Sequence, residues 1–158
     1  MNKDNIKIRT ANESDIENLN NLYKELDKDA INFQPEHFVM SIREDEYYLQ
    51  ILENENSDFL VLEDDDKMLG FALVTMVQSK KLSCLKQQRF VYIGDLVITE
   101  TKRSNGFGTI LMDSCKKYGK ERGAEFIRTQ VFPGNAEGMR YYEKNNFKET
   151  MKTIEACC

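Results

Sequence analysis

The segment Phe90–Phe132 constrains the fold of this 158-residue chain more than any other part of it. It begins with the run FVYIGDLVI, whose β-branched and aromatic residues are typical of a central strand. A loop with two glycines and an amphipathic helix follow, and Gly123 is placed to end that helix. A second strand is predicted over Glu125–Phe132. Because a strand–helix–strand unit needs a crossover connection, we expect its two strands to be parallel.

The remainder of the chain supplies further strands and helices around this unit. Ile6 and Ile8 alternate with polar residues and predict a short first strand, and Asn12 is placed to cap the helix that follows. The expected order is β-α-α-β-β-β-α-β-α-β, which makes an α/β fold with a mixed sheet in a single domain over residues 1–158. The other expected elements are a helical region opened by Pro35, a hairpin of Phe59–Glu63 and Met68–Val77, a helix at Ala136–Asn145 and a final strand at Lys148–Glu155.

Charge is distributed unevenly along the chain. The formal net charge is −5, which argues against a generic nucleic-acid binder because phosphate backbones attract positive surfaces. Residues 36–66 contain eleven acidic residues and one basic residue, whereas residues 101–148 contain ten basic and five acidic residues. The first part is suited to a cation and the second to an anion, although the solvated faces of ordinary helices give the same pattern.

No part of the sequence predicts a membrane segment or a metal site. The longest uncharged apolar stretch, Met68–Gln78, is eleven residues long and too short to span a bilayer. The N-terminus lacks the apolar region of a signal peptide, so we expect a cytoplasmic protein without a membrane partner. None of the four cysteines forms a CxxC pair and His37 is the only histidine, so we expect reduced thiols and no metal.

The segment Leu96–Thr109, with the sequence LVITETKRSNGFGT, carries the clearest chemical signal. The free amides and the partial positive charge at a helix N-terminus form an anion site. Glycine lets a ligand approach the backbone, and Lys102 and Arg103 add positive charge. The segment matches neither a Walker A loop nor the GxGxxG dinucleotide fingerprint. Taken alone, two glycines before a helix also fit a simple tight turn.

Two patterns in this half of the chain resemble those of one family. Arg103–Gly108, with the sequence RSNGFG, resembles the R/Q-x-x-G-x-G/A signature of the GNAT superfamily of N-acetyltransferases. Asn135–Phe147 is similar to the family's second pattern, N-x-x-A-x-x-x-Y-E-K-x-G-F. It departs at Gly138, where alanine is usual, and at Asn146, where glycine is usual; asparagine tolerates the left-handed backbone needed there. The opening IRTANESDI and the element order also resemble the family, so the resemblance covers nearly the whole chain.

The resemblance implies a GNAT-like acyl-CoA N-acyltransferase fold, in which helices flank a central mixed β-sheet and its two parallel strands splay apart. It implies acetyl-CoA as cofactor, with backbone groups of Leu96, Val97 and Ile98 pairing with the pantetheine arm. Asn135 is expected to contact the pantetheine near the open end. The pyrophosphate is expected on the loop that comprises Arg103, Ser104, Asn105, Gly106, Phe107, Gly108 and Thr109.

The resemblance also implies that a neutral amine attacks the thioester directly in a ternary complex, without an acetyl-enzyme intermediate. Tyr142 matches the family tyrosine that protonates or hydrogen-bonds the leaving thiolate, and its alternative role is ordinary helix packing. A phenol with a pKa of about 10 is a weaker acid than a thiol at about 8.5, so full proton transfer is uphill by about 2 kcal/mol in water. A backbone amide around Val97 is the oxyanion donor that the resemblance implies.

The general base is not fixed by the sequence. Gln130 and Gly94 stand where two groups of family members carry glutamate, which leaves Asp95 as the candidate. Asp95 either accepts the proton through a water molecule or serves as a structural hydrogen-bonding group in the strand.

The acceptor site is expected between the helical region Pro35–Asn54 and the loop Lys80–Arg89, because loops and variable helices carry specificity on a fixed scaffold. Glu44, Asp45 and Glu46 are placed to attract a cationic amine. Three tyrosines form either walls of that site or core, namely Tyr47, Tyr48 and Tyr92.

We therefore predict an N-acetyltransferase that transfers an acetyl group from acetyl-CoA to a primary amine of a small molecule, such as a polyamine, an aminosugar or an amino-acid-like compound. The alternatives are acetylation of a protein or peptide amino group and a non-catalytic CoA-binding regulatory domain. A toxin that acetylates charged tRNA is disfavoured by the net charge. The sequence leaves the oligomeric state open, and a homodimer is compatible with it.

Overall fold

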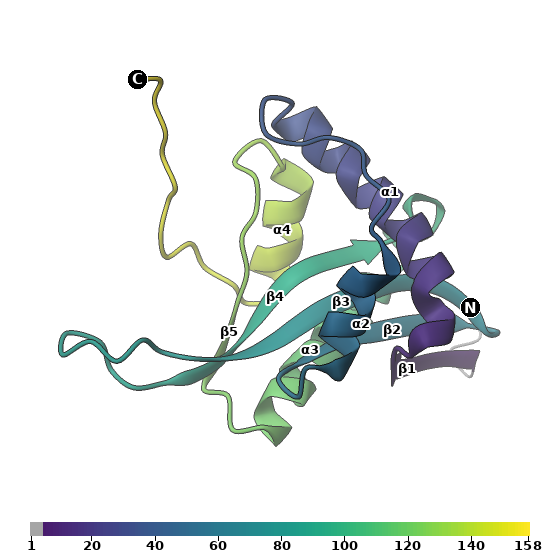
Figure 1. Cartoon of the computed structure of the whole chain (residues 1–158), viewed down its shortest axis with the longest axis horizontal. Coiled ribbons are helices and arrows are strands. Elements are labelled where there is room, and N and C mark those ends of the chain that lie inside the picture. The colour runs from purple at the N-terminus through teal and green to yellow at the C-terminus, as the bar shows by residue number, and fades with distance from the viewer. Residues whose placement is uncertain (1–4) are drawn as a thin grey trace.

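The computed structural model describes residues 5–158. The hairpin, the central strand and the helices that flank the last strand all form close to their predicted bounds (Figure 1). No helix in this part of the chain is long and apolar enough to cross a membrane. In chain order the elements are β1 (Ile6–Thr10), the 3₁₀ helix η2 (Glu13–Asp15), α1 (Ile16–Phe33), α2 (Asp45–Glu53), β2 (Ser57–Asp64), β3 (Lys67–Gln78), β4 (Arg89–Ile98), the 3₁₀ helix η3 (Glu100–Lys102), α3 (Phe107–Glu121), β5 (Phe126–Arg128) and α4 (Ala136–Lys144).

The strands of residues 5–158 form one sheet in the order β1-β2-β3-β4-β5. Neighbours from β1 to β4 are antiparallel, whereas β4 and β5 are parallel, as the crossover through α3 requires. The predicted α/β fold with a mixed sheet is therefore confirmed. The β4–β5 pairing covers only Phe90–Tyr92, although β4 continues to Ile98.

Helices cover both faces of the sheet (Figure 1). α1 and α2 lie on one face, where Tyr23 and Tyr48 are buried in a core that includes Val97 of β4. α3 lies on the other face, where Leu111 is fully buried and α4 adds Tyr142 to the edge of the same core. The sheet therefore separates two cores, and alternate residues of each strand belong to different ones.

The predicted cap fixes the start of the first helix. Asn12 Oδ1 accepts a hydrogen bond from Ser14 N, and Asp15 Oδ2 accepts one from Asn12 N, each at 2.9 Å. This capping box closes η2, which leads directly into α1. Asp15 also accepts two hydrogen bonds of 2.7 Å from Arg9, and Arg9 bonds Glu63 of β2 at 2.6 Å. The entry to α1 is thereby tied to both strands at this edge of the sheet.

The helical region predicted to open at Pro35 is wrong for its first ten residues. Residues 35–44 form a turn and an irregular segment, and the helix begins only at Asp45. Phe38 and Ile42 stand at helical spacing, but they are 39% and 68% exposed and belong to neither of the two cores. The segment is held by polar contacts with α1 instead, because Ser41 N donates to Asp27 Oδ2 at 3.3 Å.

The final strand predicted at Lys148–Glu155 does not form in the single chain. The segment is exposed and has no strand partner in the described part of the chain, and β5 has three residues rather than the eight predicted. A strand needs a neighbour that pairs with its backbone groups, and alternation alone does not supply one.

Candidate active site

A bulge in β4 decides which side chains reach each face of the sheet. The register between β3 and β4 shifts at Gly94, which is an extra residue on β4. Such a bulge bends the strand and increases its twist. Ile93 belongs to the core under α3, yet Val97, four residues later, belongs to the core under α1. The bulge therefore reverses the alternation and turns Asp95 toward α1.

β4 and β5 separate where this bulge begins. Thr129 Oγ1 donates a hydrogen bond to Ile93 O at 3.0 Å, and no strand pairing with β5 is present beyond Tyr92 in the described chain. On its other side, β4 remains paired with β3 as far as Ile98. The edge of β4 that turns away from β3 is therefore open beside the predicted residues Leu96–Ile98. An extended ligand can bind such an edge as an added strand.

The first turn of α3 lies at the end of the loop that follows this open edge. Gly106 is the N-cap residue with a φ of 84°, a left-handed conformation that favours glycine. No side chain among residues 5–158 caps α3, and the amides of Phe107, Gly108 and Thr109 have no hydrogen-bond partner there. A Cβ at Gly106 would meet no atom within 4 Å. The turn thus presents free donors and open space, which fits a phosphate group.

Gly108, the second glycine of the loop, is explained by helix packing. A Cβ there would lie 3.0 Å from a ring carbon of Tyr141, and the Tyr141 hydroxyl donates to Gly108 O at 2.7 Å. The missing side chain therefore lets α4 pack directly against the first turn of α3.

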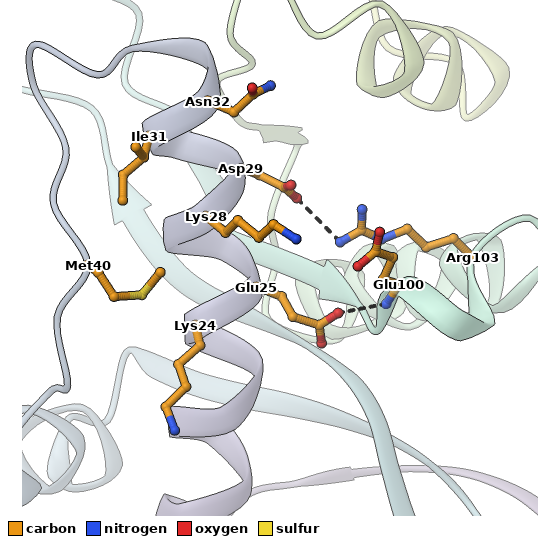
Figure 2. Close-up of a pocket in the computed structure, with 9 residues that line it drawn as sticks. All are labelled: Lys24, Glu25, Lys28, Asp29, Ile31, Asn32, Met40, Glu100 and Arg103. Atoms are coloured by element: carbon orange, nitrogen blue, oxygen red, sulfur yellow. Dashed lines mark hydrogen bonds and ion pairs between the residues drawn. The ribbon is translucent and has the colours of Figure 1, made fainter.

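Arg103 links the loop to β4 and α1 through hydrogen bonds. Its Nε donates to Ile98 O at 2.9 Å, and its Nη2 donates to Asp29 Oδ2 at 3.3 Å. Glu25 of α1 bonds the same loop, because it accepts from Glu100 N at 2.7 Å. Figure 2 shows both links between the helix and the loop.

A cavity of about 640 Å³ lies between α1 and this loop, and Figure 2 shows the Lys28 ammonium extending from α1 toward Arg103. Of the residues predicted to hold the cofactor, only Arg103 lines it. Sequence reasoning missed the cations of α1, because their position beside the loop depends on how the helix packs. The lining residues are Lys24, Glu25, Lys28, Asp29, Ile31, Asn32, Met40, Glu100 and Arg103.

Tyr142 lies on α4, where its ring centroid is 5.1 Å from that of Tyr141 and 5.3 Å from that of Phe147. Burial raises the pKa of the Tyr142 hydroxyl, and the neighbouring Thr129 hydroxyl acts in the opposite direction. Because Thr129 bonds Ile93 O, the Tyr142 phenol lies near the point where β4 and β5 separate. A phenol with a raised pKa remains protonated at neutral pH and serves as a hydrogen-bond donor.

Asp95 lies at the end of a hydrogen-bonded chain of tyrosines on the α1 face. The Tyr23 hydroxyl donates to Asp95 Oδ2 at 2.8 Å and lies 3.1 Å from the Tyr47 hydroxyl. Burial raises the pKa of Asp95, and the hydrogen bond from Tyr23 partly opposes that rise. A carboxylate with a raised pKa is a better proton acceptor near neutral pH.

Arg43 and Asp27 support this chain of tyrosines. The Arg43 guanidinium lies 3.8 Å from the centroid of the Tyr23 ring and donates to both oxygens of Asp27, at 3.0 and 2.9 Å. The sequence did not predict that these residues surround Asp95, since no motif joins α1 to the segment before α2. We call these five residues the Asp95 cluster: Asp95, Tyr23, Tyr47, Arg43 and Asp27.

The structure does not bring all the predicted acceptor residues together. Tyr48 is fully buried core, whereas Tyr92 is half-buried and donates to Gln130 Oε1 at 3.1 Å. The loop between β3 and β4 lies at the opposite end of β4 from Ile98 (Figure 1).

The acidic residues Glu44, Asp45 and Glu46 are exposed at the start of α2. The partial positive charge of a helix N-terminus favours carboxylates there without any ligand.

Asn135 caps α4, since its Oδ1 accepts from Gly138 N at 2.9 Å. A Cβ at Gly138 would lie 2.5 Å from Asn135 Nδ2, so alanine at this position would require the Asn135 side chain to shift. Asn146 has a φ of 69°, so the left-handed backbone expected at this position is confirmed.

Comparisons with known proteins agree with this geometry. The model of the acetyltransferase (GNAT) family matches residues 19–147. YhfO of Bacillus subtilis, described as an uncharacterized N-acetyltransferase, is 26% identical over 155 residues, with 96% of each chain covered. A mutant of the BH1408 protein from Bacillus halodurans has a TM-score of 0.91 at 23% identity, covering 96% of this chain and 99% of that one. AAC(6')-Iy in complex with the bisubstrate analogue CoA-S-monomethyl-acetylneamine has a TM-score of 0.74 at 17% identity, with 97% of each chain covered.

Proposed function

This chain belongs to the acetyltransferase (GNAT) family, and on that premise we propose that it transfers the acetyl group of acetyl-CoA to a primary amine of a small molecule. The observation that carries the proposal is the separation of β4 and β5 directly before a helix N-terminus with free amides. An open strand edge and a phosphate-binding turn, placed one after the other, suit a ligand that has an extended amide-containing arm and a pyrophosphate.

The chain's own residues fit both parts of that ligand. Backbone groups of Leu96–Ile98 are proposed to pair with the pantetheine amides, and Asn135 to contact the arm from the α4 side. The pyrophosphate is assigned to the loop from Arg103 to Thr109, where Gly106 leaves the approach to the α3 amides free. When bound, acetyl-CoA supplies the acetyl group in an activated thioester.

Tyr142 is proposed to donate a hydrogen bond from its phenol to the leaving sulfur. Its burial supports this role, because the raised pKa holds the proton on the phenol throughout the neutral range. Stabilisation by a hydrogen bond avoids the cost of full transfer from a phenol to a thiolate, which is about 2 kcal/mol in water. A backbone amide around Val97 is proposed as the donor to the developing oxyanion.

Asp95 is proposed to accept the proton that the acceptor ammonium must lose, directly or through one water molecule. An alkyl ammonium has a pKa of about 10.4, so the amine is almost fully protonated at neutral pH. Burial raises the pKa of Asp95 toward neutral pH, which improves it as a base. Tyr23 is a positioning residue in this proposal, because its hydroxyl holds the Asp95 carboxylate.

A small-molecule amine is the acceptor class that the observations favour. The structurally similar AAC(6')-Iy is described as an aminoglycoside N-acetyltransferase. Within the Asp95 cluster, Arg43 pairs with Asp27 and covers the Tyr23 ring, so Asp95 is the carboxylate that is left to attract an ammonium ion.

The proposal is tested by measuring thiol release from acetyl-CoA against polyamines, aminosugars, amino acids and peptides. We expect release that saturates with one class of small amine. Release with peptides alone would replace the acceptor class, and tight CoA binding without release for any acceptor would point to a regulatory domain.

A further inference from the structure

The last contacts between β4 and β5 are made by side chains. Backbone pairing of the two strands ends where Tyr92 lies opposite Arg128. One residue further along each strand, the Thr129 hydroxyl donates a hydrogen bond to Ile93 O at 3.0 Å, so it occupies the place of a backbone amide in the next pair. Ile93 is buried in the core under α3, so this bond lies at the edge of that core.

A second side-chain bond joins the same two strands on the other face of the sheet. Tyr92 and Ile93 are neighbours in β4, so their side chains point to opposite faces, and Ile93 belongs to the core under α3. Tyr92 therefore faces the α1 side, where its hydroxyl donates to Gln130 Oε1 at 3.1 Å. We call the residues of the two bonds the β4–β5 junction: Tyr92, Ile93, Thr129 and Gln130. The junction is the point at which the strands begin to separate.

Beyond the junction, no bond bridges the space between β4 and the chain that follows β5. Among the described residues, residues 94–98 form no hydrogen bond with any residue after Gln130. In the proposed function, the pyrophosphate lies at Gly106 and the pantetheine arm beside Leu96–Ile98. The thioester end of the cofactor then points back along β4, away from the N-terminus of α3 and toward the junction.

The position of Tyr142 leads to the same conclusion. Its hydroxyl adjoins that of Thr129, and it is the group that is proposed to bond the leaving sulfur. The sulfur is thus separated from the junction by one side chain, and the acyl group extends into the space that remains. A longer acyl chain would have to break the Thr129 bond and leave Ile93 O without a donor beside an apolar core, which is costly.

We propose that the β4–β5 junction limits the length of the acyl group, so that the chain accepts acetyl-CoA and rejects acyl-CoA with longer aliphatic chains. The inference rests on the proposed function, because it requires the thioester to lie beside β4. Thr129 is the specificity-determining residue, since its hydroxyl holds the two strands together without touching the reacting atoms. Tyr92 and Gln130 act in the same sense on the other face, where their bond is exposed and therefore weaker.

Isothermal titration calorimetry with CoA, acetyl-CoA and hexanoyl-CoA tests this limit without an acceptor amine. An open groove would bind hexanoyl-CoA more tightly than acetyl-CoA, because its additional methylenes leave water. A closed groove must instead be forced apart. We therefore expect the Kd of hexanoyl-CoA to be at least about tenfold higher than that of acetyl-CoA in the native chain. The sign of the difference distinguishes the two arrangements.

Two variants of Thr129 separate its hydrogen bond from its bulk. Thr129→Val keeps the shape of the side chain and removes the hydroxyl, whereas Thr129→Ser keeps the hydroxyl and is the matched control. In Thr129→Val we expect the ratio of the two Kd values to fall about tenfold, and in Thr129→Ser to stay native, with the Kd of CoA unchanged in both. Gln130→Ala is expected to lower the ratio by a smaller factor. Gln87→Ala, which removes an exposed glutamine bond in the loop before β4, is expected to leave it unchanged.

The results separate this inference from the proposed function. Absence of CoA binding by the native chain would contradict the proposed function itself, and the inference with it. If CoA binds, the inference is overturned by a native chain that binds hexanoyl-CoA as tightly as acetyl-CoA, or by equal ratios in Thr129→Val and Thr129→Ser. Circular dichroism confirms that each variant is folded. If Thr129→Val does not fold, Gln130→Ala decides the outcome, because its change lies at an exposed position.

Discussion

Removal of the Tyr142 hydroxyl is expected to separate the effect on catalysis from the effect on acetyl-CoA binding most cleanly. Tyr142→Phe keeps the ring contacts with Tyr141 and Phe147 and removes only the donor. We expect kcat to fall about 100-fold or more, which is the size of a typical acid–base contribution, with the Kd for acetyl-CoA nearly unchanged. Thiol-release kinetics and calorimetry measure the two quantities. Tyr118→Phe, which removes a hydroxyl bonded to Asp58, is the matched control, and an unaltered kcat in Tyr142→Phe would contradict the role.

Tyr23 affects the reaction through the titration of Asp95. Its hydrogen bond lowers the pKa of Asp95, so Tyr23→Phe raises that pKa further. Asp95 must be ionised to accept a proton, and a higher pKa means that ionisation is lost at a higher pH. We therefore expect the acidic limb of the kcat/KM profile to move to higher pH. A profile that keeps its acidic limb while kcat changes would mean that Asp95 is structural.

Gly106 and Gly123 provide a matched pair for the phosphate-binding turn. Both have positive φ, 84° and 76°, and a Cβ at either position would meet no atom within 4 Å. Alanine at each is expected to cost roughly 1 kcal/mol of stability through backbone strain alone. Only Gly106→Ala is expected to weaken CoA binding as well, because only Gly106 adjoins the free amides of α3. Equal CoA affinity in the two variants would place the pyrophosphate elsewhere.

The segment between α1 and α2 has no regular structure, and one ion pair fixes it. Arg43 bonds both oxygens of Asp27, whose side chain is only 10% exposed. Arg43→Ala leaves that carboxylate buried without a partner, so we expect a loss of about 3 kcal/mol in the free energy of unfolding. The double variant Asp27→Asn/Arg43→Gln is expected to lose less, since it leaves no buried charge. Denaturant unfolding measures both, and equal losses would show that the ion pair is not what fixes the segment.

The elements that the sequence predicted well are those whose signals are local. The apolar run of β4, the Asn12 cap and the glycine that follows α3 are each decided within a few residues. The errors arose where a distant partner decides the outcome. Residues 35–44 have apolar residues at helical spacing but are held by Asp27 and Asn20 of α1, and the tail alternates like a strand but has no neighbour in its own chain.

The sequence predicted two motifs of the candidate site, and the structure adds the residues that surround them. The loop after β4 and the tyrosine of α4 were named from patterns along the chain. The Asp95 cluster was not, because it joins β4 to two other elements and depends on the bulge at Gly94. A bulge has no reliable signature in a single sequence, and a glycine inside a strand indicates only that one is compatible.

For the whole molecule, ligand binding and folding are coupled. Acetyl-CoA is proposed to contact β4, α3 and α4 together, so it binds the folded chain and not the unfolded one. At a concentration 100-fold above its Kd, it is expected to stabilise the fold by about 2.7 kcal/mol, which thermal denaturation detects as a raised Tm. Adenosine alone, which lacks the pyrophosphate and the pantetheine arm, is the control. The absence of any rise with acetyl-CoA would count against a composite site.

The extra residue at position 94 also bears on how this protein tolerates changes in length. Deleting it would leave Ile93 paired with Val74 and Asp95 paired with Leu73, so every side chain of β4 would keep the face that it has now. The deletion would instead remove the bend and the added twist of the bulge, at the point where β5 parts from β4. A residue added or removed elsewhere in β4 shifts part of the strand relative to β3 and exchanges the faces of that part.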